Sequence, residues 1–180
     1  MENFPAIETQ RLHLTALRSD DIPQIIRHAN NKHISEFTMN IPFPYAEKDA
    51  VYWINQANEG FKNGSHFIFG IRQKHDSHFI GGIGLTMERY FRAEIGYWIA
   101  QPYWNKGLMT EAVKAVIQFG FQKLSLNKIT CSHFDKNPAS GKVMINCGMT
   151  KEGDFKEHIY KNSAFHNLII YGLTRKDYEK

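Results

Sequence analysis

The spacing of apolar side chains divides the first half of the chain into a strand, helices and a hairpin. Residues 11–16 alternate between apolar and polar side chains, which predicts a strand. Apolar residues recur at helical spacing over 22–29, after the N-cap candidates at 19–21, and again over 47–62, so we expect a helix in each segment. Two apolar runs between 66 and 85 flank a polar turn, which is typical of a hairpin of buried strands.

The second half of the chain mixes strands with two helices. Residues 93–99 predict a third strand beside the hairpin, and residues 107–124 predict a helix with one polar stripe. A strand over 128–132 follows, so this strand–helix–strand connection predicts a parallel pair within one sheet. The remaining predicted elements are a short helix over 137–148 and two strands, around 150–156 and 167–173. The order predicts an α/β (α+β) fold with a mixed, largely antiparallel sheet.

Size and composition restrict the classes of protein that the chain can be. Its 180 residues and 20.9 kDa are a single-domain length, so we expect one domain over 1–180. Apolar residues make up 42% of the chain, which excludes a wholly disordered protein. A net charge of +4 without a basic stripe is too weak to indicate a nucleic-acid partner, and no direct nucleic-acid binding is expected.

Metal, redox and membrane signals are missing from the sequence. The two cysteines form no metal or redox motif, and no pair of histidines has metal-ligand spacing with a third ligand, so we expect no metal. No segment approaches the roughly 18–20 apolar residues that span a bilayer. The first five residues (MENFP) lack the cationic and apolar regions of a signal peptide, so we expect a cytoplasmic protein with no membrane partner.

The strand-to-helix junction over 105–110 has the residues of an anion site. A helix N-terminus presents free N–H groups and about half a positive charge. Gly107 allows the backbone to approach a ligand closely, and Lys106 adds a cation, which together suit a pyrophosphate. The alternative is a turn followed by an ordinary helix cap. The sequence contains neither a GxGxxG fingerprint nor a P-loop motif, so this is not a nucleotide site of those two kinds.

Ser140 lies in the first turn of the short helix over 137–148. Asn137 followed by Pro138 is typical of a helix N-cap and first helical position, so we expect Asn137 to cap this helix. From the residues alone, a serine in such a first turn is ordinary.

Glu94 is a carboxylate in a predicted central strand. Strand alternation puts it on the face of Gly96 and Trp98. A carboxylate in that position is rarely buried without a partner. Glu94 is therefore either a structural ion-pair partner or a general base that acts directly or through a water. Glu36 is a second candidate for the general base. The alternative interpretation of Glu36 is an acidic residue on the surface with no catalytic role.

Several of these segments resemble one superfamily of enzymes. Residues 94–112 contain EIGYWI and PYWNKGLMTEA, which are similar to the acetyl-CoA-binding motif of the GNAT superfamily of N-acetyltransferases. Residues 137–140 (NPAS) and 148–153 (GMTKEG) resemble its branch of ribosomal-protein alanine/serine N-terminal acetyltransferases. The segments 8–14 and 170–174 fit that branch too, so the resemblance covers almost the whole chain.

The resemblance implies a fold and a set of cofactor contacts. The central sheet would be splayed between the parallel strands 93–99 and 128–132, with helices on both faces. The pantetheine arm of acetyl-CoA would lie in the splay, hydrogen-bonded to the backbone of the first of these strands. Lys106 or Lys142 would screen phosphate charge, or remain solvated. The implied cofactor-binding residues are Tyr97, Trp98, Ile99, Asn105, Lys106, Gly107, Leu108, Met109, Thr110, Asn137 and Ser140.

The chain departs from the family pattern at two positions. Asn105 stands where the family often has Gly. Because Asn tolerates the left-handed backbone region better than most residues, we expect the loop still to form. Asn167 stands where the branch often has Asp. A contact between a negatively charged side chain at this position and the acceptor is therefore not expected.

The resemblance also implies a mechanism and an acceptor. Ser140 would donate a proton or a hydrogen bond to the leaving thiolate, and a backbone N–H of 97–99 would stabilise the oxyanion. Glu94, Glu36 or a water would take the proton of the attacking amine. Deprotonation at pH 7 costs about 1.4 kcal/mol for an α-amine of pKa about 8, and about 5 kcal/mol for a lysine of pKa about 10.4. This difference favours an α-amine as the acceptor. The resemblance to the ribosomal-protein branch implies that it is the N-terminal α-amine of a protein, first of all a ribosomal protein.

Two other functions stay open at this point. One is acetylation of a small amine, such as a polyamine, an aminoglycoside or an amino acid. The other is a non-catalytic acyl-CoA-binding module. The segments 33–46 and 156–166 would determine the acceptor, and the oligomeric state, monomer or homodimer, is open.

Overall fold

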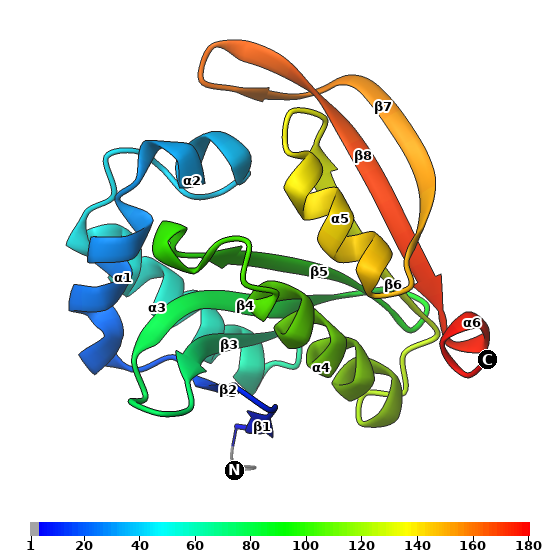
Figure 1. The fold of residues 1–180 in the computed structure, drawn as a ribbon, viewed down its shortest axis with the longest axis horizontal. Helices are drawn as coiled ribbons and strands as arrows, with labels where there is room; N and C mark the ends of the chain where they lie inside the picture. The colour runs from blue at the N-terminus through cyan, green and yellow to red at the C-terminus, as the bar shows by residue number, and fades with distance from the viewer. Residues whose placement is uncertain (1–3) are drawn as a thin grey trace.

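The computed structural model of the protein describes residues 4–180. The prediction that the chain has no signal peptide depends partly on residues 1–3, which lie outside this range. Eight strands form one sheet, and helices lie on both of its faces (Figure 1). The strands are β1 (Ile7–Glu8), β2 (Leu12–Ala16), β3 (His66–Gln73), β4 (Phe79–Glu88), β5 (Arg92–Ile99), β6 (Lys128–Phe134), β7 (Thr150–Lys161) and β8 (Ala164–Thr174). The helices are α1 (Ile22–Ala29), α2 (Lys32–Phe37), α3 (Glu47–Lys62), α4 (Leu108–Gln122), α5 (Pro138–Asn146) and α6 (Arg175–Tyr178).

The sheet is mixed, as the sequence predicts. The strand order is β1-β2-β3-β4-β5-β6-β8-β7, and every neighbouring pair is antiparallel except β5 and β6. These two parallel strands are joined by the crossover helix α4. Their pairing extends only from Arg92↔Lys128 to Glu94↔Thr130. The strands then separate, which confirms the expected splay between the two parallel strands.

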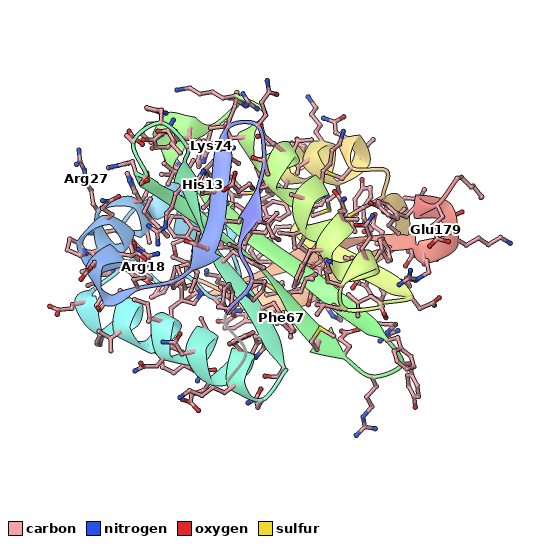
Figure 2. All side chains as sticks on the ribbon, turned by 90° about the horizontal axis from the view of Figure 1, so that it is seen from below. His13, Arg18, Arg27, Phe67, Lys74 and Glu179 are labelled. Atoms are coloured by element: carbon pink, nitrogen blue, oxygen red, sulfur yellow. The ribbon has the colours of Figure 1, made fainter. Side chains whose placement is uncertain are left out.

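Strand alternation sorts the side chains of β5 between two cores. Ala93 and Ile95 join the larger buried cluster, which includes the apolar face of α4. Trp98 packs against the other cluster, which α1 and α3 cover. Figure 2 shows the sheet between α3 on one side and α4 on the other. Glu94 therefore lies on the α1–α3 face, the same face as Trp98, as predicted.

The segment before α1 differs from its prediction as an N-cap. Ser19–Asp21 forms a short 3-10 turn, and no side chain of this turn caps α1. The Asp21 carboxylate instead forms a buried pair with Arg72 of β3, with both guanidinium–carboxylate distances at 2.7 Å. This pair connects the start of α1 to the sheet.

The last two strands are longer than the sequence predicts. β7 and β8 form one long hairpin, with register shifts between Lys151 and Gly153 and between Phe155 and Ile159. Its turn residues Asn162 and Ser163 have φ of 50° and 60°. Most of the segment expected to be an acceptor loop, 156–166, is therefore strand. Nearly all of β7 is exposed, so no apolar alternation marks its length in the sequence. The short elements β1, α2 and α6 were also not predicted individually. No helix among residues 4–180 is long and apolar enough to cross a membrane.

Candidate functional site

Beyond the residues that pair with β6, the edge of β5 has no strand beside it in the described part of the chain. The Ala100 N–H donates to Ile80 O of β4 at 2.8 Å. Because backbone direction alternates along a strand, Tyr97 and Ile99 direct their backbone groups the other way, toward β6. Ile99 O accepts a hydrogen bond from Trp104 Nε1 at 2.7 Å. The Tyr97 and Ile99 N–H groups are thus the donors that an extended ligand in the splay can reach.

Trp98 does not share this position. It pairs with Gly82 in the β4–β5 ladder. Its ring lies 6.0 Å from the rings of both Trp53 and Phe79, measured between centroids. Of the three β5 residues expected to contact the cofactor, the structure brings the backbone of two to the splay, and Trp98 supports the core behind them.

Ser140 and Tyr97 meet across the splay, on the face that α5 covers. Ser140 lies in the first turn of α5, and its N–H donates to Asn137 Oδ1 at 3.3 Å, which confirms the predicted cap. The Tyr97 hydroxyl is 3.0 Å from Ser140 Oγ and 3.1 Å from Ser140 O. Burial, together with the neighbouring Cys131, raises the pKa of Tyr97 far above its ordinary value. The phenol therefore keeps its proton, and it orients the serine hydroxyl.

Glu94 meets β6 on the opposite face of the sheet. The Ser132 hydroxyl donates a hydrogen bond to Glu94 Oε1 at 2.9 Å. This contact lies two residues beyond the last paired position of β6, so it bridges the two strands where they begin to separate. Both side chains are half-buried. The carboxylate keeps its second oxygen for another partner.

The cations closest to Glu94 along the two strands are engaged elsewhere. Arg92 pairs with Glu88 at 2.9 Å, and Lys128 pairs with Glu152 at 2.6 Å. No ion pair within 4.0 Å involves Glu94 among residues 4–180. A carboxylate in a central strand was expected to need a partner, and the partner of Glu94 is the Ser132 hydroxyl. The geometry therefore does not favour a structural ion pair.

The junction between β5 and α4 has the backbone conformation of an anion cradle. Asn105 and Gly107 have φ of 59° and 73°, both in the left-handed region. Gly107 is the N-cap of α4, and no side chain caps this helix end. The N–H groups of the first turn, at 108–110, are thus open to a ligand. The expectation that Asn105 permits the loop to form is confirmed.

Arg11 supports this loop from the start of the chain. Its Nη1 donates to Lys106 O at 3.0 Å, and its Nε lies 2.7 Å from Glu111 Oε2 on α4. The Lys106 ammonium lies 5.6 Å from the centre of the Tyr103 ring. Lys142 is exposed on α5. Arg11 was not predicted as a site residue, because it is close to the loop only in the folded chain.

We expect the Gly107→Glu variant to bind acetyl-CoA more weakly, by more than about tenfold or about 1.4 kcal/mol. A side chain at φ of 73° is strained, and a carboxylate there opposes the pyrophosphate. Isothermal calorimetry measures the affinity. The matched control is Gly64→Glu, since Gly64 also has φ of 73° and has open space around it at the end of α3. Equal affinity of the folded Gly107→Glu variant and the control would contradict the cofactor assignment.

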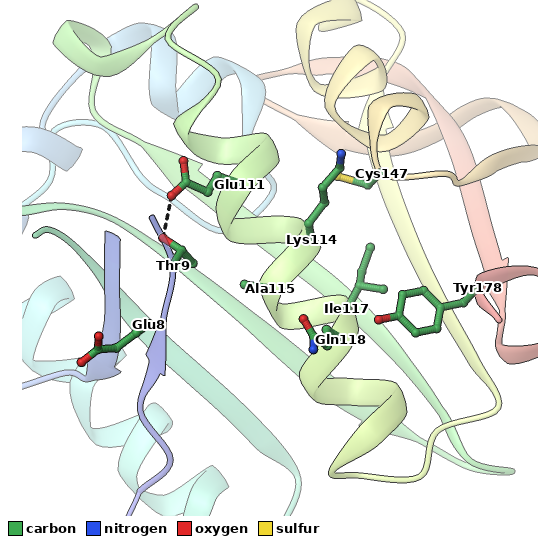
Figure 3. Close-up of a pocket in the computed structure, with 9 residues that line it drawn as sticks. All are labelled: Glu8, Thr9, Glu111, Lys114, Ala115, Ile117, Gln118, Cys147 and Tyr178. Atoms are coloured by element: carbon green, nitrogen blue, oxygen red, sulfur yellow. Dashed lines mark hydrogen bonds between the residues drawn. The ribbon is translucent and has the colours of Figure 1, made fainter. Parts of the chain in front are cut away.

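Two concavities lie near these residues. One, of about 460 Å³, is on the outer face of α4, between β1 and the end of α5; Figure 3 shows Glu111 and Lys114 on its wall. It contains none of Glu94, Tyr97 and Ser140. The other, of about 340 Å³, lies between α2, the end of β6 and the β7–β8 hairpin. Its walls include Glu36, Phe37, Phe134, Lys136, Asn162 and His166.

The sequence as a whole matches a known family. The model of the acetyltransferase (GNAT) domain matches residues 11–150, which is most of the chain. The protein therefore belongs to the GNAT family of N-acetyltransferases, and both the sequence resemblance and the mixed, splayed sheet agree with this.

Particular relatives are distant. The chain is 26% identical over 174 residues to the uncharacterized N-acetyltransferase YoaA of Bacillus subtilis, covering 96% of this chain and 98% of that protein. It is 27% identical over 128 residues to the ribosomal protein uS5-alanine N-acetyltransferase of Escherichia coli, covering 69% and 66%. The solved structure of Mycobacterium smegmatis RimJ in complex with CoA-disulfide has the same fold, with a TM-score of 0.88, 18% identity, and coverage of 98% and 90%.

Proposed function

We propose that the protein transfers an acetyl group from acetyl-CoA to the N-terminal α-amine of a protein, with a ribosomal protein as the first candidate. One observation carries this proposal. The splay has a proton donor pair, Ser140 with Tyr97, on one face and a carboxylate, Glu94 held by Ser132, on the other. Acyl transfer to an amine needs a proton acceptor on the amine side and a proton donor on the thiolate side.

Each candidate residue has a separate role in the proposed acetyl transfer. Acetyl-CoA, when bound, supplies an activated acetyl thioester. The N–H groups of 105–110, of which those of 108–110 form the uncapped first turn of α4, hold the pyrophosphate. The Tyr97 or Ile99 N–H stabilises the oxyanion that forms on the acetyl carbonyl. Glu94 accepts the proton of the attacking amine, directly or through a water. Ser140 donates a proton or a hydrogen bond to the departing thiolate, and the Tyr97 hydroxyl orients the serine hydroxyl.

The cavity between α2 and the hairpin supports a peptide acceptor. Its walls carry one carboxylate, Glu36, and one ammonium, Lys136, beside the stacked rings of Phe134 and His166. A polyamine keeps one or more ammonium groups after the reacting amine is deprotonated, and it would favour a wall with several carboxylates. An extended peptide needs only one amine site and apolar or polar contacts for its first residues.

Acetylation of a small amine is the second candidate. A solved spermidine N-acetyltransferase chimera from Vibrio cholerae and hSSAT shares the fold, with a TM-score of 0.79 at 20% identity. The test is a panel of peptides starting with Ala or Ser, together with spermidine, an aminoglycoside and free amino acids. Each is incubated with acetyl-CoA and read by mass spectrometry and thiol release. Peptide acetylation alone supports the proposal, acetylation of small amines alone overturns its acceptor, and binding without thiol release indicates a non-catalytic acyl-CoA-binding module.

For Ser140→Ala we expect kcat to fall roughly 10²-fold, with little change in the affinity for acetyl-CoA, because proton donation to the leaving group matters in the transition state. Steady-state kinetics and calorimetry measure the two quantities. Tyr97→Phe is the companion variant. It keeps Ser140 and removes only the orienting hydroxyl, so its loss of kcat should be smaller. If Ser140→Ala raises the KM for acetyl-CoA at constant kcat, Ser140 only positions the cofactor.

A further inference from the structure

Lys161, the last residue of β7, donates its ammonium hydrogens to a group of backbone carbonyls far away in the sequence. Nζ lies 2.7 Å from Ser35 O, 3.1 Å from Ile41 O and 3.3 Å from Met39 O, and it also contacts Thr38 O. An ammonium has three donors, so this arrangement saturates it. We call this set of contacts the Lys161 bridge.

The carbonyls of the bridge belong to the end of α2 and the segment after it. Ser35 O is in the last turn of α2, and Thr38 is its C-cap. The carbonyl end of a helix carries partial negative charge, which favours a cation there. Ser35 is itself buried, and its hydroxyl donates to Ile41 O at 2.8 Å. The receiving segment is therefore folded around the ammonium.

Within the described residues, the hydrogen bonds between the hairpin and this segment, 33–46, all come from Lys161. The aromatic residues near the tip, Tyr160 and Phe165, are 66% and 62% exposed and pack on each other at 5.0 Å between ring centroids. Figure 1 shows the hairpin tip reaching over toward α2.

The bridge joins two walls of one cavity. Glu36 and Phe37 of α2 line the concavity of about 340 Å³, and so do Asn162 and His166 of the hairpin. The anchoring carbonyls of Ser35 and Thr38 lie within two residues of Glu36, and Asn162 directly follows Lys161. The distance between these walls therefore depends on the bridge.

We infer that Lys161 is a specificity-determining residue that sets the width of the acceptor cavity, and that the cavity so defined takes the first residues of an extended peptide. This inference rests on the proposed function for the identity of the acceptor. Lys161 itself positions the walls and does not act on the reacting atoms. Without its charge, α2 and the hairpin separate, and the cavity loses its shape for a peptide.

The test is Lys161→Met, which keeps the aliphatic stem and removes the ammonium. We expect hydrogen exchange of the amides in 33–46 to accelerate at least about tenfold, since charge-assisted hydrogen bonds hold this segment. We expect the KM for the best peptide acceptor to rise about tenfold while the affinity for acetyl-CoA stays within about twofold. Lys161→Arg, which still donates to carbonyls, should recover part of both effects.

Lys156→Met is the matched control. Lys156 lies on the same strand, its side chain is 74% exposed, and its one ion pair among residues 4–180 is with Asp154, at 3.3 Å. Its substitution should change neither exchange nor kinetics. Unchanged exchange over 33–46 in Lys161→Met overturns the bridge, and accelerated exchange with an unchanged acceptor KM overturns its role in specificity. If the wild-type protein acetylates only small amines, the proposed acceptor fails, whereas the exchange result still reports on the bridge.

Discussion

Glu94→Gln should lower kcat/KM by roughly 10²–10⁴ and remove the acid limb of its pH profile, because that limb reports the essential base of the free enzyme. Glutamine keeps the shape of the side chain and an oxygen that can accept the Ser132 hydrogen bond. It cannot take a proton from the attacking amine. The melting temperature should therefore change little. Values of kcat/KM measured between pH 5 and 9, together with thermal unfolding, test this expectation.

Glu36→Gln is the control for the rival base. Glu36 lies at the wall of the cavity proposed for the acceptor, 3.5 Å from His33 and 3.9 Å from Lys32. We expect its substitution to affect the KM of the acceptor and to leave the acid limb in place. If Glu36→Gln removes the limb and Glu94→Gln does not, the assignments must be exchanged. If neither changes the profile, the amine loses its proton to water.

Asp21→Ala should destabilise the protein by about 3–5 kcal/mol, because it leaves the buried Arg72 guanidinium without its carboxylate and with only the neutral acceptors Thr15 Oγ1 and Ala16 O. The two side chains are only 7% and 10% exposed, and their bidentate contact connects the turn before α1 to β3. For a chain of this size, a loss of that order lowers Tm by about 10 °C. Chemical unfolding followed by circular dichroism gives the free energy of unfolding directly.

Glu59→Ala is the matched control for this effect. It breaks the Glu59–Lys62 pair, which has the same distance of 2.7 Å but side chains that are 67% and 61% exposed. Exposed pairs contribute about 0–1 kcal/mol, so this variant should be close to wild type. Equal losses of stability in the two variants would show that burial does not strengthen the Asp21–Arg72 pair. Because this pair is not part of the proposed transfer site, kcat of Asp21→Ala measured well below its Tm should be near the wild-type value.

Local patterns in the sequence determined most of the elements and the order in which they join. Apolar spacing predicted β5 and α4. Because another strand, β6, follows α4 in the chain, this strand–helix–strand order predicted the single parallel pair. The Asn137 cap and the left-handed Asn105 also follow from the preferences of single residue types. These features depend on a few neighbouring residues, so they can be predicted without knowledge of the fold.

The sequence was less informative where a strand lacks a buried face. β7 is exposed along nearly all of its length, so it has no alternation to mark where it ends. The hairpin with β8 therefore extends well past the expected strands. As a result, the segment expected to be an acceptor loop is mostly a strand ladder, and its Lys161 reaches α2.

Tertiary structure alone decided which side chains meet. Periodicity indicates the face of a strand on which a residue lies, but it does not indicate its partner on another element. Tyr97 and Ser140 are 43 residues apart, Glu94 and Ser132 are 38 apart, and Lys161 is 126 residues from Ser35. Their contacts arise because β5 and β6 separate after three paired positions and the hairpin extends over α2. Glu94 was a candidate from the sequence itself and Ser140 from the family resemblance, whereas their pairing with Ser132 and Tyr97, and the contacts of Lys161, required the fold.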